Sequence, residues 1–158
     1  MTGLIPIDRV LRQIRGGLPH RSVLLWKTDD QGLYLRELRI RNMKQGLGTE
    51  TMLSILHEAD LRGLPVRLEA DSFDDYGTPD LFTLVCWYER MGFERQHIEN
   101  DCWVSMTRSL REPIPVEEMR HNYEADRVND LDRTEFKRWF DDAQATDDTC
   151  RSASYRQR

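Results

Sequence analysis

Hydrophobic residues recur along the first part of the chain with two different periods. Apolar residues three and four positions apart predict an amphipathic helix: Ile7, Val10, Leu11 and Ile14. Gly16 and Gly17 follow and end it. The apolar run 22–27 and the segment 33–41 predict two strands, and the polar turn 28–32 joins them as an antiparallel hairpin.

The helical period returns after this hairpin. Residues 49–62 carry an apolar stripe, and Gly63 stands where a residue just beyond a helix end is expected. Residues 66–71 alternate between apolar and polar, as a half-buried strand does. Because a helix separates this strand from the strand 33–41, the two strands are predicted to be parallel.

A second helix and a closing hairpin complete the pattern. Thr78 is the expected N-cap of this helix, and Gly92 ends it. The segments 93–98 and 102–107 predict the hairpin. The order α-β-β-α-β-α-β-β predicts a mixed α/β (α+β) fold with a mostly antiparallel central sheet and helices on both faces.

The chain changes character after residue 110, which predicts a domain over 1–110 and a C-terminal extension over 111–158. Pro113 and Pro115 indicate a linker, residues 129–144 predict one helix, and a polar tail follows. The helix has an apolar stripe: Phe136, Trp139 and Phe140. This stripe either packs on the domain's own sheet or forms a homodimer or protein-partner surface.

Composition narrows the class of protein. The 158 residues are 39% hydrophobic and 32% charged, and no apolar run approaches the roughly 20 residues that span a membrane. The net charge of −5 argues against broad nucleic-acid binding. Three widely spaced cysteines and the lack of a signal-peptide pattern predict a cytoplasmic protein. No zinc-binding spacing occurs, so no metal site is expected.

A glycine turn over 43–50 lies between the predicted strand 33–41 and helix 49–62. Glycine lets the backbone approach a ligand closely, and the amides of a first helical turn have no partner within the helix. The positive end of the helix dipole favours an anion there. The turn is therefore either a phosphate site or only a tight turn.

Five consecutive segments together resemble a GNAT-type N-acetyltransferase. They are the strand 33–41, the turn 45–49, the helix 52–62, the strand 67–71 and the segment Cys86-Trp87-Tyr88-Glu89-Arg90-Met91-Gly92-Phe93. The match covers roughly residues 22–107 and implies a GNAT-like fold that uses acetyl-coenzyme A.

The resemblance assigns roles to particular residues. It implies that the turn binds the pyrophosphate of acetyl-coenzyme A: Gln45, Gly46, Leu47, Gly48 and Thr49, with Lys44 as a nearby charge. It implies that the backbone of Leu38 and Ile40 pairs with the pantetheine arm. Tyr88 aligns with the tyrosine often proposed in the family to protonate the departing thiolate, and its spacing also places it on the apolar stripe of its helix.

Two features depart from the family pattern. Met43 occupies a position where the family usually has Arg or Gln. The neighbouring Lys44 carries a positive charge, but a lysine does not reproduce the geometry of an arginine. The N-terminal half is also short, so the acceptor site is either open or walled by another chain or by the extension.

Glu37 is the first candidate for the general base, because it lies on the strand beside the expected cofactor. Its structural alternative is a solvated carboxylate paired with Arg36 or Arg39. Glu69 and Asp71 are weaker alternatives for the base. His57 and His97 are expected to be a helix-surface residue and a strand residue.

The chemistry leads to two hypotheses from different classes. The first is an enzyme that transfers an acetyl group from acetyl-coenzyme A to an amine of a small molecule or a protein. The second is a non-catalytic GNAT-like interaction or assembly module whose extension binds a partner. An acetylating toxin or a nucleic-acid-associated enzyme is a third and weaker reading, against which the acidic charge counts.

Overall fold

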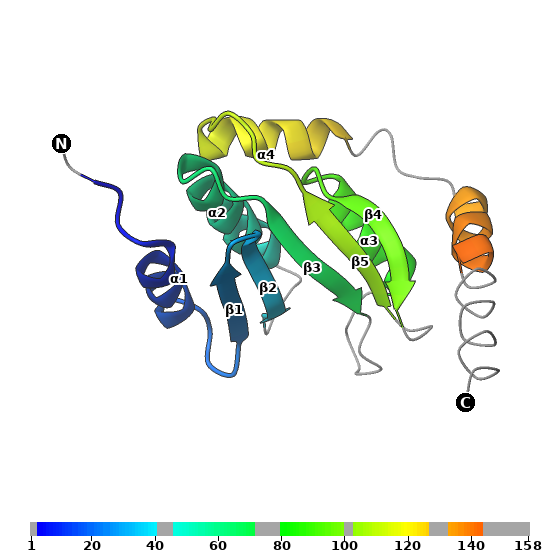
Figure 1. The fold of residues 1–158 in the computed structure, drawn as a ribbon, viewed down its shortest axis with the longest axis horizontal. Coiled ribbons are helices and arrows are strands. Elements are labelled where there is room, and N and C mark those ends of the chain that lie inside the picture. The colour runs from blue at the N-terminus through cyan, green and yellow to red at the C-terminus, as the bar shows by residue number, and fades with distance from the viewer. Residues whose placement is uncertain (1–2, 41–45, 72–79, 100–102, 127–132, 144–158) are drawn as a thin grey trace. The chain divides into compact units, whose positions relative to one another are not determined.

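The order of elements in the structure confirms the predicted alternation of helices and strands (Figure 1). The computed structural model describes residues 3–40, 46–71, 80–99, 103–126 and 133–143. Its elements are α1 (Ile7–Gly16), β1 (Val23–Asp29), β2 (Gly32–Arg39), α2 (Leu47–Leu61), β3 (Val66–Asp71), α3 (Leu81–Glu89), β4 (Glu94–Glu99), β5 (Trp103–Arg108) and α4 (Val116–Ala125). Residues 133–143 are also helical, and we call them helix 133–143. No helix within these ranges is long and apolar enough to cross a membrane.

The strands form a five-stranded sheet in the order β1-β2-β3-β5-β4. β1 and β2 are antiparallel, whereas β2 and β3 are parallel, as the helix between them predicted. The arrows of β4 and β5 point in opposite directions in Figure 1. This sheet confirms the predicted mixed fold class.

The start of β2 is fixed against the residue that precedes β3. The backbone N–H of Leu33 donates to the carbonyl oxygen of Pro65 at 2.9 Å. A Cβ atom on Gly32 would lie 2.3 Å from that same oxygen, and Gly32 has a φ of +109°. Only glycine fits this position, so Gly32 sets the register from which β2 and β3 run in parallel.

The chain groups into two compact units, and each is described by itself. The first contains Met1–Leu68 and Thr107–Ala125, and the second contains Glu69–Met106 and Asp126–Arg158. The predicted division of the chain at residue 110 stays a prediction.

The core of the first unit is centred on α2. The predicted stripe is confirmed, since these residues are at most 2% exposed: Met52, Leu53, Leu56 and Ala59. Ile55 is buried as well, and α2 packs against both α1 and α4. Each fully buried leucine of this kind stabilises the folded state by about 1.5–3 kcal/mol.

Both ends of α2 contain a glycine with a positive φ. Gly63, with a φ of +61°, follows the cap residue Arg62, which confirms the predicted helix end. At the other end the helix begins earlier than predicted, at Leu47, directly after Gly46. Gly48 and Thr49 therefore belong to the first helical turn and not to a loop that precedes it.

In the second unit, α3 has a buried stripe made of Leu84, Val85 and Tyr88. Its N-cap is Asp80, whose side chain accepts a hydrogen bond from the Thr83 N–H at 2.7 Å. The prediction of Thr78 as the cap is wrong, because the helix begins at Leu81 and a cap directly precedes the first helical residue. Thr78 itself lies outside the described residues.

The C-terminal extension holds one more helix than predicted. The prolines led us to assign residues before 129 to a linker, but 116–125 form α4. Pro115 stands at the start of α4 and its carbonyl accepts a hydrogen bond from the Met119 N–H at 3.1 Å. Met119 and Tyr123, four residues apart, are each 7% exposed and form the buried face of α4.

Candidate functional site

The predicted phosphate turn is described from Gly46 onward, whereas Met43, Lys44 and Gln45 lie outside the described residues. Gly46 has a φ of +73° and is exposed. A Cβ atom built on Gly46 meets no atom of the described residues within 4 Å. The space beside this residue is therefore open to a ligand.

The N-terminus of α2 has the donors that an anion requires. The first helical hydrogen bond runs from the Glu50 N–H to the Gly46 carbonyl at 3.1 Å, so the amides of Leu47 and Gly48 come before it. No side chain among the described residues caps this end. The backbone amides of the first helical turn and the helix dipole together favour a phosphate or carboxylate at this position.

An arginine from the extension contacts the first turn of α2. Arg120 of α4 binds the Glu50 carboxylate with two hydrogen bonds, Nε to Oε1 at 2.5 Å and Nη2 to Oε2 at 2.6 Å. The Arg120 guanidinium lowers the pKa of the Glu50 carboxyl below its ordinary value. The pair keeps the local charge near neutral beside the turn. Sequence reasoning missed Arg120, since only the apolar spacing of α4 could have indicated that it faces α2.

β2 leaves its partner β3 before it reaches the turn. The two strands pair from Leu33 with Val66 to Leu35 with Leu68, while β2 continues to Arg39. On its other side, Leu25 and Trp26 of β1 face Glu37 and Leu35, so that Arg36 is an extra residue in β2. Such a bulge bends a strand and ends its pairing, and bulges often lie next to binding sites.

The predicted residues of β2 lie in the stretch beyond this bulge. Leu38 is half-buried and Ile40, just after the strand, is 4% exposed. The Glu37 carboxylate lies 3.1 Å from the Arg39 guanidinium, with 26% of the Glu37 side chain exposed. This ion pair matches the structural alternative for Glu37, and its role as a base stays a prediction.

Tyr88 lies in the second unit. Its side chain is 8% exposed and its ring centre lies 4.9 Å from that of Trp87 and 5.5 Å from that of Phe93. Burial raises the pKa of the Tyr88 phenol well above its ordinary value. A phenol is already protonated at neutral pH at its ordinary pKa of about 10, and burial favours the same form. Its position toward a cofactor stays a prediction.

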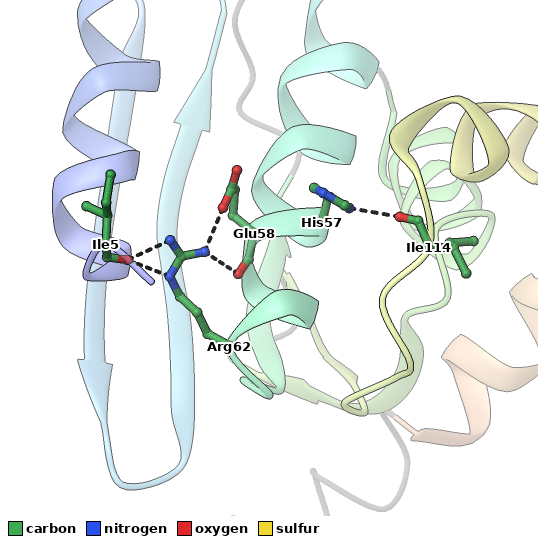
Figure 2. A network of polar contacts seen from close by, with 5 residues as sticks. All are labelled: Ile5, His57, Glu58, Arg62 and Ile114. Atoms are coloured by element: carbon green, nitrogen blue, oxygen red, sulfur yellow. Dashed lines mark hydrogen bonds and ion pairs between the residues drawn. The ribbon is translucent and has the colours of Figure 1, made fainter. Parts of the chain in front are cut away.

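The other titratable candidates have ordinary structural partners. Figure 2 shows the His57 ring, whose Nδ1 lies 2.8 Å from the Ile114 carbonyl oxygen. His97 is exposed and lies 2.8 Å from Glu99. Glu69 and Asp71 are half-buried in β3, and their suggested roles stay predictions. Within the described ranges, no three His, Cys, Asp or Glu side chains are grouped to hold a metal ion.

Comparisons with known proteins add little to this geometry. No protein-family model matches the sequence, and no curated protein matches it. Among solved structures, the chain is similar to an acetyltransferase from Bacillus cereus ATCC 14579, known from a crystal structure at 1.9 Å. The two share 14% sequence identity with a TM-score of 0.39, over 70% of this chain and 96% of that chain. This degree of similarity leaves the functional argument to the residues of this chain.

Proposed function

We propose that this protein binds acetyl-coenzyme A and transfers the acetyl group to an amine of a small molecule or a protein. The observation that carries the proposal is the course of β2. It leaves β3 at the Arg36 bulge and leads to the uncapped N-terminus of α2. A strand edge and a helix N-terminus joined in this way offer backbone groups to an extended ligand that ends in phosphates.

The described residues fit the phosphate part of this ligand. Gly46 leaves open space where a side chain would stand, and the amides of Leu47 and Gly48 supply donors. Lys44, Gln45 and Thr49 complete the set that the resemblance implies. The backbone at Leu38 and Ile40 would accept the pantetheine arm along β2.

Two side chains would carry out the two proton transfers of the reaction, one from the amine and one to the leaving sulfur. When bound, acetyl-coenzyme A supplies an activated thioester. An alkylamine has a pKa of about 10.4, so Glu37 would take its proton before the new C–N bond forms. The Tyr88 phenol is protonated at neutral pH, as any tyrosine with a pKa of about 10 or higher is, and would donate its proton to the sulfur as the C–S bond breaks. Glu37 is then the base and Tyr88 the acid.

Titration calorimetry with acetyl-coenzyme A tests the proposal through a matched pair of variants at Gly46. Asn and Asp both tolerate a left-handed backbone and are nearly the same size, but only Asp adds a negative charge. We expect Gly46→Asp to weaken binding by about ten-fold or more relative to Gly46→Asn, which is about 1.4 kcal/mol. Wild-type protein that fails to bind at millimolar ligand, or equal affinities for the two variants, would overturn the phosphate site.

The ion pair between Glu37 and Arg39 favours a second function, a non-catalytic GNAT-like module. One carboxylate oxygen of Glu37 is engaged by the Arg39 guanidinium 3.1 Å away, as in a structural ion pair. Such a module would bind acetyl-coenzyme A and turn over no amine. Mass-spectrometric screening of amine acceptors with wild type and Glu37→Gln separates the two functions, because only the enzyme gives products that the variant loses.

A further inference from the structure

Helix 133–143 packs against α3 within the second unit. The Phe136 side chain is 7% exposed, and its ring lies edge-on to Phe82 of α3 with the centres 5.2 Å apart. Trp139 and Phe140 lie beside Phe136 at 5.9 and 6.0 Å and are half-buried. The predicted aromatic stripe thus packs against α3 of its own chain, while the homodimer or partner interface stays a prediction.

Arg95 of β4 connects three elements of this unit. Its guanidinium lies 4.7 Å from the Trp139 ring centre and 5.7 Å from that of Phe136. Its Nε lies 2.7 Å from Glu89 at the end of α3, and its Nη2 lies 3.4 Å from Glu135 of helix 133–143. The Arg95 and Glu89 side chains are 15% and 21% exposed, so this pair is partly shielded from water, whereas Glu135 is 51% exposed and its pair with Arg95 is solvated.

A second arginine holds the other end of α3. The Arg133 guanidinium lies 4.5 Å from the Phe82 ring centre, and its Nη2 lies 3.3 Å from the carboxylate of Asp80. Asp80 is also the side chain that caps α3. Helix 133–143 therefore contacts α3 directly at its first turn, through Asp80 and Phe82. At the last turn of α3, Arg95 of β4 bridges Glu89 and Glu135 of helix 133–143.

We propose that helix 133–143 is a strap that positions α3, the helix that carries Tyr88, and that it opens as a unit of its own before the rest of the fold. A helix gains most of its stability from the packing of its apolar face. This face has one nearly buried ring, Phe136, whereas α2 has a full buried stripe. Elements with few buried apolar contacts open at lower free energy than the core.

Arg95→Met in the full-length protein tests the strap directly. Methionine keeps an apolar stem but removes the charge, so the stacking on Trp139 and the ion pairs to Glu89 and Glu135 are lost. Native-state hydrogen exchange read by mass spectrometry should show helix 133–143 and α3 exchanging about ten-fold faster or more, with α2 unchanged. Arg138→Met, an exposed position on the same helix, is the matched control and should exchange like wild type.

Two results would overturn the strap. One is equal acceleration across the whole chain, which would make helix 133–143 part of the global unfolding unit. The other is unchanged exchange in helix 133–143 and α3. If Arg95→Met does not fold, Trp139→Leu supplies the same measurement, because it removes the cation–π contact and keeps an apolar side chain.

A kinetic readout links the strap to Tyr88 and rests on the proposed acetyltransferase function. Arg95→Met should lower kcat and leave the KM for acetyl-coenzyme A unchanged, because α3 carries the proposed acid and the phosphate turn belongs to the first unit. Wild-type protein without any turnover would remove the proposed function alone. The exchange measurement needs no substrate and still decides the strap.

Discussion

The two ends of α2 carry ion pairs of the same chemistry in opposite surroundings. At the C-terminal end, Arg108 binds Asp60 through two hydrogen bonds of 2.6 and 2.9 Å, and the two side chains are 3% and 2% exposed. At the N-terminal end, Arg120 binds Glu50 in the same two-pronged way, but these side chains are 42% and 44% exposed. The first unit thus closes one end of its central helix and leaves the other open to solvent.

Further contacts strengthen the closed end. The Arg62 guanidinium donates to the carbonyl of Ile5 at 2.8 and 2.6 Å and to the carboxylate of Glu58 at 2.6 Å (Figure 2). His57 lies one turn before and contacts the Ile114 carbonyl. The segments that precede α1 and α4 are both tied to this part of α2. The contacts at the closed end therefore stabilise the fold, whereas the open end is available for a ligand.

Replacing each of the two arginines by alanine should give the largest difference in unfolding free energy between the two ends of α2. Arg108→Ala leaves the Asp60 carboxylate buried without its partner, which costs about 3–5 kcal/mol of unfolding free energy. Arg120→Ala removes a pair of the same geometry whose side chains are exposed and screened by solvent, so its loss should be much smaller. Urea denaturation followed by circular dichroism measures both. Equal losses of unfolding free energy for the two variants would show that burial does not decide how much such an ion pair stabilises the fold.

A charge cycle at the open end should give an effect of intermediate size. Glu50→Gln removes a negative charge beside the proposed phosphate site, and we expect it to tighten coenzyme A binding. The gain should not exceed about 1 kcal/mol, the interaction of two unit charges about 4 Å apart in water. Calorimetry with Arg120→Gln in the Glu50→Gln background then tells what the arginine does. Weaker binding means that Arg120 itself attracts the anion, whereas unchanged binding means that it only neutralises Glu50.

Local patterns predicted most of the first unit, because they depend on residues a few positions apart. The stripe of α2 and its end at Gly63 belong to this class, as does the β1–β2 hairpin. The closed end shows what such patterns miss. Asp60 is 4% exposed beside the apolar stripe, and only its pairing with Arg108, 48 positions away, makes this burial tolerable. No spacing rule indicates such a partner.

The candidate site divides in the same way. Gly46 and the helix that follows it were found from glycine spacing and helix-dipole physics, since both are local. The bulge at Arg36 depends on the register with β1, and the Arg120 contact depends on a helix that the prolines concealed. The apolar spacing of Met119 and Tyr123 was the signal that could have revealed α4.

The smallest expected effect is the pH dependence of the open end. Arg120 lowers the pKa of Glu50 in the folded protein, so the pair stabilises the fold above the ordinary glutamate pKa of about 4.3. This contribution is lost as the pH falls through the lower pKa of the folded state. The unfolding free energies of wild type and Glu50→Gln should therefore differ by about 0.2–1 kcal/mol at neutral pH and converge once the pH falls below the lowered folded-state pKa of Glu50.

Salt provides the control for this last measurement. Ionic strength near 1 M shortens the screening length to about 3 Å, so it should remove most of the difference between wild type and Glu50→Gln at neutral pH. The buried Arg108–Asp60 pair is screened much less, and the loss in Arg108→Ala should survive the same salt. A Glu50 contribution that persists in salt and at low pH would mean that Glu50 supports the helix through packing. The N-terminal end of α2 would then be part of the closed structure, and its assignment as the ligand end would fail.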